Sequence, residues 1–278
     1  MTTTLQTAIG DLEPGSVAVL GLPWDESSSF VRGAAAAPPH IRQALHSPAS
    51  NLACEAGVDL ATEHRFRDLG DLELDMAPEA FDFITETVDR VLSRKARLLA
   101  LGGDHSVTYP IVRAYARHFP RLNLLHFDAH PDLYDEFEGS RLSHACPFAR
   151  IMEEGLVQRL VQVGIRTMNP HQQAQAERFG VEVVSMRDLI PEHDFDFDGP
   201  VYLSFDLDAL DPAFAPGVAH REAGGLSTRE CLRLIGRLRV PLVGADIVEL
   251  NPSRDLHDLT AVVAAKLVKE LSSRMLDL

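Results

Sequence analysis

Carboxylate and imidazole side chains gather at three places in this 278-residue chain. The segments are residues 102–106, with the sequence GGDHS, residues 128–132, with the sequence DAHPD, and residues 206–212, with the sequence DLDALDP. A short apolar run precedes each of them. Burying several uncompensated carboxylates together is costly in free energy, so these segments, if they converge, predict a bound cation.

The spacing within the segments indicates which side chains share one site. Residues i and i+2 of an extended strand project to the same side. On that pattern Asp128, His130 and Asp132 form one series, and Asp206 and Asp208 form another. With the imidazole of the first segment, the candidate metal ligands are His105, Asp128, His130, Asp132, Asp206 and Asp208.

Four carboxylates and two imidazoles supply more ligands than one divalent ion needs, and they suit two ions that share bridging carboxylates. Oxygen and nitrogen donors without thiolate favour a hard or borderline metal such as Mn²⁺ over a structural Zn²⁺. A single Asp-x-Asp after a strand is often only a structural loop or cap. Three such elements at strand ends predict a dinuclear metal centre.

The elements that must position these residues are short apolar runs with helical patterns between them. Runs that end at Gly, Asp or Pro are typical of strands buried on both faces of a parallel sheet. Residues 33–39 are typical of a loop entering a helix, which residues 41–45 continue. Helical patterns cover residues 78–92 and 259–271, and Ser227 and Glu230 form a capping box that opens a helix to residue 238. The alternation predicts an α/β fold with a mostly parallel sheet, whose chemistry collects at the carboxyl ends of the strands. The predicted strands are 17–20, 66–69, 97–101, 122–127, 160–165, 181–184, 201–205 and 242–248.

The composition excludes several classes of protein. The chain has 41 acidic and 26 basic side chains and a net charge of −15, and phosphate binding needs clustered Lys and Arg, so we expect no nucleic-acid and no membrane partner. No apolar run approaches the ~18 residues of a membrane span, and no signal peptide is recognisable. Three widely spaced cysteines argue against a disulfide framework. We expect a single cytoplasmic domain over residues 1–278.

The three segments resemble the signature motifs of the ureohydrolase family, which includes arginases, agmatinases and formimidoylglutamases. These motifs are GGDHS, DAHxD and SFDxDxxDP, found here at residues 102–106, 128–132 and 204–212. The resemblance extends over roughly residues 17–271. It implies a three-layer α/β/α sandwich around a parallel sheet of about eight strands, and a hydrolase that uses two Mn²⁺ ions per chain.

The resemblance also implies how the two ions are held. Asp128 and Asp206 would bridge both ions. The remaining ligands would bind one ion each, His105 and Asp132 on one side and His130 and Asp208 on the other.

The implied reaction is hydrolysis of a guanidino C–N bond. Two metal ions lower the pKa of a shared water, and the resulting hydroxide attacks the guanidinium carbon to give urea and an amine. Glu249 matches the family glutamate that pairs with the guanidinium, although a surface salt bridge is its structural alternative. His144 matches the family's mobile, proton-shuttling histidine and is otherwise an ordinary loop residue. Ala145 stands where the family usually has Gly.

Three further polar residues lie beside expected ligands. Asp211 ends the third segment and is expected to form a turn or to support the site. Asp104 is expected to orient the loop before His105. His126, two residues before Asp128, is expected to support that ligand.

The loops suggest two kinds of substrate. Residues 135–143 contain three acids and lack the Asn-rich sequence typical of arginases, so they suit the second cationic end of agmatine, which would yield putrescine and urea. The loop His220-Arg221-Glu222 instead suits a substrate carboxylate, as in a guanidino acid or N-formimidoyl-glutamate. We expect agmatine to be the substrate, with these acids as the alternatives.

Two alternatives of another class are open. A deacetylase-like metallohydrolase is similar in fold but resembles a single-zinc arrangement, so the metal count and Glu249 would distinguish it. A catalytically silent, regulatory metal-binding member would have lost a ligand or His144, and this chain keeps them all. The resemblance further implies a homo-oligomer, either a trimer or a hexamer.

Overall fold

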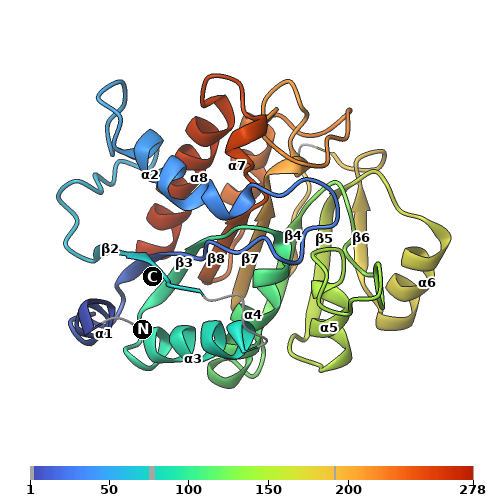
Figure 1. Cartoon of the computed structure of the whole chain (residues 1–278), viewed down its shortest axis with the longest axis horizontal. Coiled ribbons are helices and arrows are strands. Elements are labelled where there is room, and N and C mark those ends of the chain that lie inside the picture. Colours follow the sequence, from blue (N-terminus) through green and yellow to red (C-terminus); the bar gives the residue numbers. More distant parts are fainter. Residues whose placement is uncertain (1–2, 75–78, 191, 278) are drawn as a thin grey trace.

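The computed structural model describes residues 3–74, 79–190 and 192–277. Within them, eight strands form one sheet in which every neighbouring pair is parallel (Figure 1). The order across the sheet is β2-β1-β3-β8-β7-β4-β5-β6. The strands are β1 (Val17–Gly21), β2 (Phe66–Asp71), β3 (Arg97–Leu101), β4 (Asn123–Phe127), β5 (Arg159–Ile165), β6 (Glu182–Ser185), β7 (Val201–Asp206) and β8 (Leu242–Val248).

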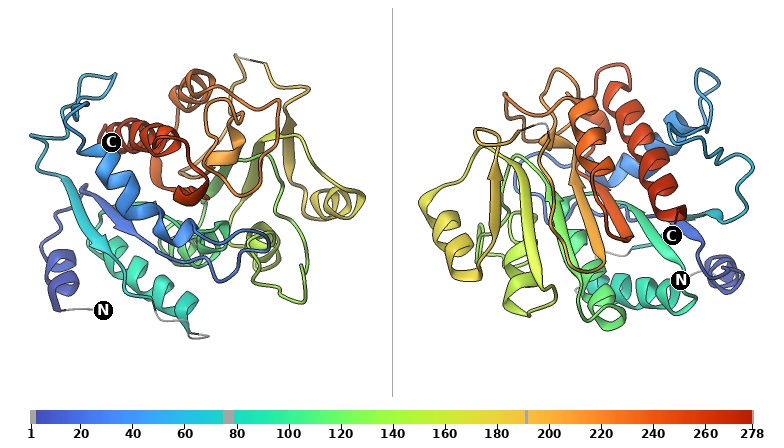
Figure 2. Two further views of the ribbon diagram at one scale, coloured as in Figure 1. Left: turned by 45° about the horizontal axis from the view of Figure 1, so that its top comes forward. Right: turned by 180° about the vertical axis from the view of Figure 1, so that it is seen from behind.

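Helices cover both faces of the sheet and complete the predicted three-layer α/β/α sandwich (Figure 2). One layer contains α2 (Ala37–Leu45), α7 (Thr228–Gly236) and α8 (Leu259–Leu276). The other layer contains α1 (Thr3–Gly10), α3 (Ala80–Ser93), α4 (Thr108–His118), α5 (Pro147–Glu153) and α6 (Pro170–Phe179).

Strand alternation explains why a strand such as β1 is apolar on both faces. In β1, Val17 and Val19 pack in the core under α2 and α8, whereas Ala18 and Leu20 pack in the core under α3 and α4. Each strand residue therefore faces one of two apolar cores, and no polar position recurs along the strand.

The predicted strands agree with the structure, with ends that shift by no more than two residues. The weak run at 66–69 is the edge strand β2, whose partial exposure explains its polar residues. The predicted helices are α2, α3, α7 and α8, although Pro78, the predicted start of α3, lies outside the described residues. The capping box is confirmed, since Ser227 Oγ accepts from the Glu230 amide and Glu230 accepts from the Ser227 amide.

The middle of the sheet consists of β3, β8, β7 and β4, whose carboxyl ends meet at one edge. Chemistry in open α/β sheets collects at that edge, and the residues that follow these four strands form the site described next. The described residues contain no helix that is long and apolar enough to cross a membrane. Cys54, Cys146 and Cys231 are buried and free.

Candidate metal centre and cleft

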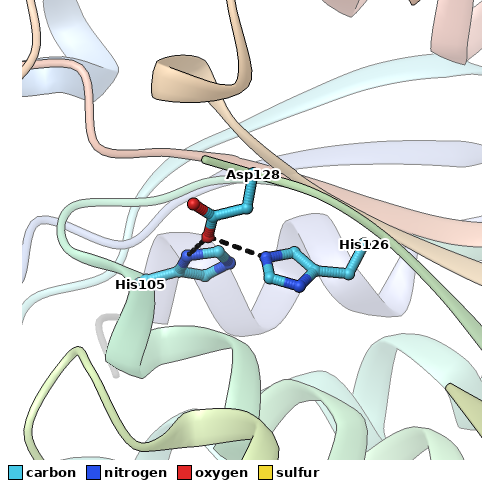
Figure 3. A group of neighbouring side chains, drawn as sticks. All are labelled: His105, His126 and Asp128. Atoms are coloured by element: carbon cyan, nitrogen blue, oxygen red, sulfur yellow. Dashed lines mark hydrogen bonds and ion pairs between the residues drawn. The ribbon is translucent and has the colours of Figure 1, made fainter. Parts of the chain in front are cut away.

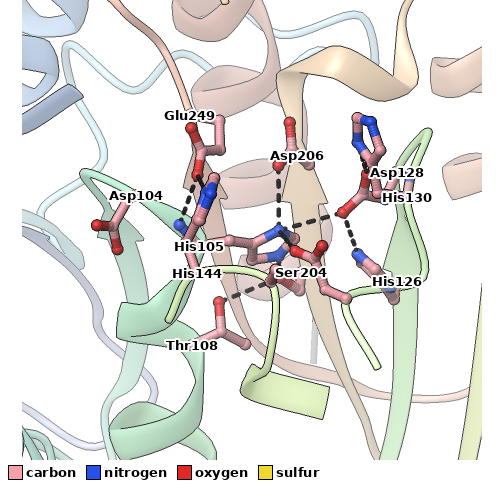
Figure 4. A network of polar contacts seen from close by, with 12 residues as sticks. Asp104, His105, Thr108, His126, Asp128, His130, His144, Ser204, Asp206 and Glu249 are labelled. Carbon is pink, nitrogen blue, oxygen red and sulfur yellow. Dashed lines mark hydrogen bonds and ion pairs between the residues drawn. The ribbon is translucent and has the colours of Figure 1, made fainter. Parts of the chain in front are cut away.

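The six predicted ligands meet above the middle of the sheet. Figure 4 labels four of them, His105, Asp128, His130 and Asp206. His105 opens the short 3-10 helix η2 (His105–Val107), which follows β3 after residues 102–104. Asp206 is the last residue of β7, and Asp208 lies in the next 3-10 turn, η3 (Leu207–Ala209). The loop after β4 supplies Asp128, His130 and Asp132.

The i, i+2 spacing of an extended strand is the predicted reason for this convergence, and that prediction is wrong. β4 ends at Phe127, so residues 128–132 are not part of a strand. Asp132 adopts a left-handed backbone conformation with φ of 47°, which is uncommon for a residue with a side chain. Asp208 follows Asp206 around a tight turn in which the Asp206 carboxylate accepts from the Asp208 amide at 2.8 Å. Tight turns, and not strand spacing, bring the carboxylates together.

His105 lies at the centre of three carboxylates. Its Nδ1 is 3.0 Å from Asp206 Oδ2 and 3.2 Å from both Asp128 Oδ2 and Asp132 Oδ2. The ring is fully buried, and Nδ1 has no partner in hydrogen-bond geometry. A buried nitrogen that faces three carboxylate oxygens in this way fits a site for a shared cation.

His130 forms the second side of the cluster. Its Nδ1 is 3.0 Å from Asp208 Oδ2 and 3.4 Å from Asp128 Oδ1. Asp128 thus presents one oxygen to each imidazole, the arrangement that a bridging carboxylate requires. Asp206 presents one oxygen to His105 and uses the other to close its turn.

His126 supports the central carboxylate, as its place in the sequence predicts (Figure 3). Its Nε2 lies 2.8 Å from Asp128 Oδ2. The amide of Gln162 lies 3.0 Å from Nδ1 of the same ring. Because that amide donates to Nδ1, the proton of a neutral His126 is on Nε2, where it is donated to Asp128. Although His105, His126 and Asp128 lie close enough to share an ion, both nitrogens of His126 already have partners.

Asp104 and Asp211 orient loops, as expected. The fully buried Asp104 accepts from the amides of Ser106 and Ser27 and so joins two loops at the site. Asp211 accepts from the amides of Gly224 and Ala213, which is turn formation away from the cluster.

Electrostatic crowding perturbs the pKa values of the cluster. Burial, followed by repulsion from Asp208 and Asp128, raises the pKa of Asp206 well above its ordinary value. Burial and the Asp128 charge raise the pKa of Asp208 to about 6. Burial alone would lower the pKa of His130, but the adjacent carboxylates outweigh it and raise this pKa to about 12. The cluster therefore demands positive charge, which a divalent ion supplies.

His144 and Glu249 form an ion pair at the side of the cluster. His144 Nδ1 lies 2.8 Å from Glu249 Oε1, which also accepts from the His105 amide at 2.9 Å. Nε2 of the same imidazole is 2.8 Å from Ser29 Oγ. Glu249 is 5% exposed, so its alternative interpretation as a surface salt bridge is wrong. Burial lowers the pKa of His144, but the Glu249 charge outweighs burial and raises it to about 9.

A close backbone approach holds Glu249 at the end of β8. Glu249 has φ of 66°, and its amide donates to the Gly103 carbonyl at 2.8 Å. A Cβ atom on Gly103 would lie 1.8 Å from the Trp24 carbonyl oxygen, so only glycine fits there. The second Gly of GGDHS thus lets the loop of Trp24 and the end of β8 meet at the site.

A cleft of about 210 Å³ opens above the cluster. We call two parts of its wall the buried end and the rim. The buried end consists of Asp132, His144, Asp206, Asp208 and Glu249. The rim consists of the half-buried residues Ser29, Tyr134, Phe137, Thr167, Asn169 and His220.

The sequence motifs did not predict most of the rim residues. Ser29, Tyr134 and Asn169 come from three separate loops, and no sequence pattern links them. Asn169 caps α6 through the Gln172 amide and donates to the Tyr134 hydroxyl at 2.5 Å. Asn before Pro at a helix start is a recognisable cap signal, but it says nothing of a cleft.

The loops that suggested substrates behave differently from each other. In the loop at 220–222, the His220 ring lies 5.2 Å from that of His144 and lines the cleft. Arg221 instead donates to the backbone carbonyls of Pro216 and Arg254. In the acidic loop, Asp135 is paired with Arg141 and Arg150. Neither the guanidinium of Arg221 nor the carboxylate of Asp135 is available in the cleft.

Comparison with known proteins places this fold and site in one class. Residues 15–273 match the Arginase family. The chain is 44% identical to Arginase 1, mitochondrial, of Arabidopsis thaliana, over 94% of this chain and 81% of that one. It is 36% identical to an agmatinase of Edwardsiella ictaluri, over 91% of this chain and 86% of that one. The solved arginase from Medicago truncatula superposes with a TM-score of 0.87 at 40% identity, over 98% of this chain and 91% of that one.

These similarities, together with the fold and the cluster, define a hydrolase of the class to which arginases and agmatinases belong. The chain belongs to the arginase family of ureohydrolases. The expectation drawn from its three motifs is thereby confirmed, as is the family's eight-stranded α/β fold.

Proposed function

We propose that this protein holds two Mn²⁺ ions in the carboxylate cluster and hydrolyses a guanidino C–N bond to release urea. The observation that carries the proposal is the buried Nδ1 of His105, which faces three carboxylate oxygens at 3.0–3.2 Å without a hydrogen-bond partner. Nitrogen and oxygen donors without thiolate favour manganese. The proposed ligands are His105, Asp128, His130, Asp132, Asp206 and Asp208.

When bound, such ions lower the pKa of a water molecule and so make a nucleophile available near neutral pH. Glu249 binds the substrate. One of its oxygens is held by His144 and the His105 amide, whereas Oε2 accepts no hydrogen bond from the described residues. That oxygen is the group that meets the guanidinium, and the carboxylate orients it through charge-assisted hydrogen bonds.

His144 holds and moves the proton. Its raised pKa of about 9 keeps the ring protonated near neutral pH, so it can donate to the leaving amine. Ser29 holds Nε2 and Glu249 holds Nδ1, so the ring reaches the cleft in a fixed orientation. The amine can leave only after it is protonated, which gives this imidazole its place in the reaction.

We propose L-arginine as the principal substrate. The support for this choice is the identity of 44% to a plant arginase, compared with 36% to an agmatinase. Agmatine, which the acidic loop favours in the sequence, is the second candidate. The observation that favours agmatine is that none of the described residues lining the cleft is an Arg or Lys, so a substrate carboxylate would meet only neutral rim groups.

Two further expectations stay predictions. The cytoplasmic location rests on composition, and the trimeric or hexameric assembly rests on family resemblance. Sedimentation of the purified protein would measure the second.

The test is turnover by the Mn²⁺-loaded protein of arginine, agmatine, guanidinobutyrate, guanidinopropionate and N-formimidoyl-glutamate. We expect urea release with the highest kcat/KM for arginine. Metal-loaded protein that turns over none of the five would contradict a ureohydrolase and leave the silent, regulatory alternative. Formamide in place of urea would identify the formimidoyl substrate. A higher kcat/KM for agmatine would reverse our order of the two candidates.

A further inference from the structure

A carboxylate beneath the cluster has no role in the reaction described above. Asp246 lies inside β8, in the run LVGADIV, and is fully buried. Three hydroxyl groups donate to it: Ser204 Oγ to Oδ1 at 2.7 Å, and Tyr202 and Thr108 to Oδ2 at 2.8 and 2.9 Å. A buried carboxylate inside an apolar strand is costly, so its contacts need a reason.

Ser204 connects this carboxylate to the cluster, and Figure 4 shows Ser204 beside His105. Its Oγ lies 2.9 Å from Nε2 of His105. A hydroxyl has one hydrogen, and here it is donated to Asp246, because an ionised carboxylate can only accept. Nε2 of His105 must then be the donor to Ser204. The neutral ring therefore carries its proton on Nε2 and keeps a lone pair on Nδ1, the atom that faces the three carboxylates.

We propose that Asp246, acting through Ser204, is a positioning residue that fixes the tautomer of His105 in which Nδ1 can bind a metal ion. This inference rests on the proposed function, since it concerns the metal ligand. Fixing the tautomer of a ligating imidazole through its second nitrogen is a general requirement of metal sites. Here the group that fixes the tautomer is the Asp246 carboxylate, which acts through the Ser204 hydroxyl and does not contact the imidazole.

We call the two hydrogen bonds that run from His105 to Ser204 and from Ser204 to Asp246 the relay. The contacts predict that Asp246→Asn reverses the direction of both. Tyr202 and Thr108 both donate at the Oδ2 position, so the amide oxygen occupies that position and the NH₂ group faces Ser204. Ser204 then accepts from the amide and donates its hydrogen to His105 Nε2. Its other neighbour, Thr108 Oγ1, is more distant at 3.3 Å. The imidazole proton moves to Nδ1, where it blocks the metal.

The inversion gives the variants a definite order. Asp246→Asn should weaken Mn²⁺ binding at one of the two sites by about 10- to 100-fold. Ser204→Ala removes the relay and leaves the tautomer free, so its loss should be smaller. Adding Ser204→Ala to Asp246→Asn removes the misdirected donor and should restore affinity to that of Ser204→Ala alone. Tyr202→Phe is the matched control, since it removes a hydrogen bond to Asp246 but leaves the relay; we expect a change within about threefold.

The experiment combines calorimetric titration of Mn²⁺ with ¹⁵N NMR of the imidazoles in the metal-free proteins. Burial lowers the pKa of His105, but Asp128, Asp132 and Asp206 outweigh burial and raise this pKa well above its ordinary value, so the spectra are recorded at rising pH until the His105 ring is neutral. We expect an Nε2–H signal for His105 in the wild type and an Nδ1–H signal in Asp246→Asn. An unchanged tautomer in Asp246→Asn, or a double variant weaker than both single variants, would overturn the inference. If Asp246→Asn does not fold, mixed His105 tautomers in Ser204→Ala support the inference and a single Nε2–H form contradicts it. Wild-type protein that binds no Mn²⁺ would overturn the proposed function, while the NMR arm would still decide the tautomer.

Discussion

The buried end of the cleft and its rim are built by different means. At the buried end and in the metal-ligand cluster beneath it, carboxylates and imidazoles hold one another. Strand ends fix these residues, as with His105 after β3 and Asp206 at the end of β7. At the rim, residues from separate loops meet through few contacts, such as the hydrogen bond between Asn169 and Tyr134. We infer that the first region determines the reaction and the second determines which molecule undergoes it.

The largest effect should come from Asp128→Asn, which removes the charge between the imidazoles of His105 and His130 in the metal-ligand cluster beneath the buried end. We expect urea release to fall about 1,000-fold for every substrate, because metal activation of water contributes several kcal/mol, and we expect less Mn²⁺ per chain. Asp135→Asn is the control, since that carboxylate lies in the acidic loop and pairs with Arg141 and Arg150. Metal content equal to that of the wild type in Asp128→Asn would contradict the assignment.

Glu249→Gln should act on all guanidino substrates alike. The amide keeps an acceptor for His105 and His144 but loses the negative charge, so kcat/KM should fall about 100-fold, the usual scale for breaking a buried charged pair. Steady-state urea assays with arginine and agmatine measure the loss. If one substrate were affected ten times more than the other, Glu249 would belong functionally to the rim.

The pH dependence of stability should reveal the pair of His144 and Glu249. Burial lowers the pKa of His144, but Glu249 raises it to about 9 from an ordinary 6.5. A raised pKa stabilises the fold below the unfolded-state value and loses that contribution as pH rises through the folded-state value. In chelator-treated protein, the stability advantage over His144→Asn should therefore shrink by about 1–3 kcal/mol between pH 6 and pH 10. Urea denaturation at both pH values gives the number, and a constant advantage would mean that the pair carries no net charge interaction.

A change at the rim should alter preference more than rate. Tyr134→Phe removes the hydroxyl that accepts from Asn169 and frees that amide in the cleft. Losing one such hydrogen bond is worth about 1 kcal/mol, or about fivefold. We expect a shift of that size in the ratio of kcat/KM for arginine and agmatine. Equal changes for both substrates would contradict the inference that the rim determines substrate preference.

The smallest effect should come from Arg221→Ala. The Arg221 guanidinium donates to two backbone carbonyls and does not line the cleft. The KM for arginine should change less than about twofold, on the scale of surface substitutions. A rise of tenfold or more in KM, only for substrates that have a carboxylate, would restore Arg221 as a substrate-binding residue.

The division also explains what the sequence could predict. Strands such as β1 and β8 are recognisable because both of their faces are apolar, and the ligands follow strands directly, so their convergence is predictable from topology alone. The left-handed turn that brings in Asp132 is not encoded by any strand period. The rim depends on how loops far apart in the chain meet, which no local pattern contains.

Asp246 and Ser204, which lie beneath the cluster, could be predicted from the sequence only in part. Asp246 is a single carboxylate within the apolar run of β8, and such a residue is itself a signal that a partner must be present. Its partner Ser204 precedes Asp206 by two residues on β7, a placement that is visible in the sequence. The hydrogen-bond direction between them depends on the three-dimensional contacts and cannot be read before the strands are paired.

The central four strands have a consequence for how this protein reaches its native state. β3, β8, β7 and β4 are neighbours in the sheet but lie far apart along the chain, so the ligand set is incomplete until long-range parallel pairing has occurred, which is intrinsically slow. Metal ions that bind only the finished arrangement stabilise it by mass action. Manganese should therefore slow unfolding far more than it accelerates refolding, because it stabilises the completed sheet and not the transition state in which the sheet forms.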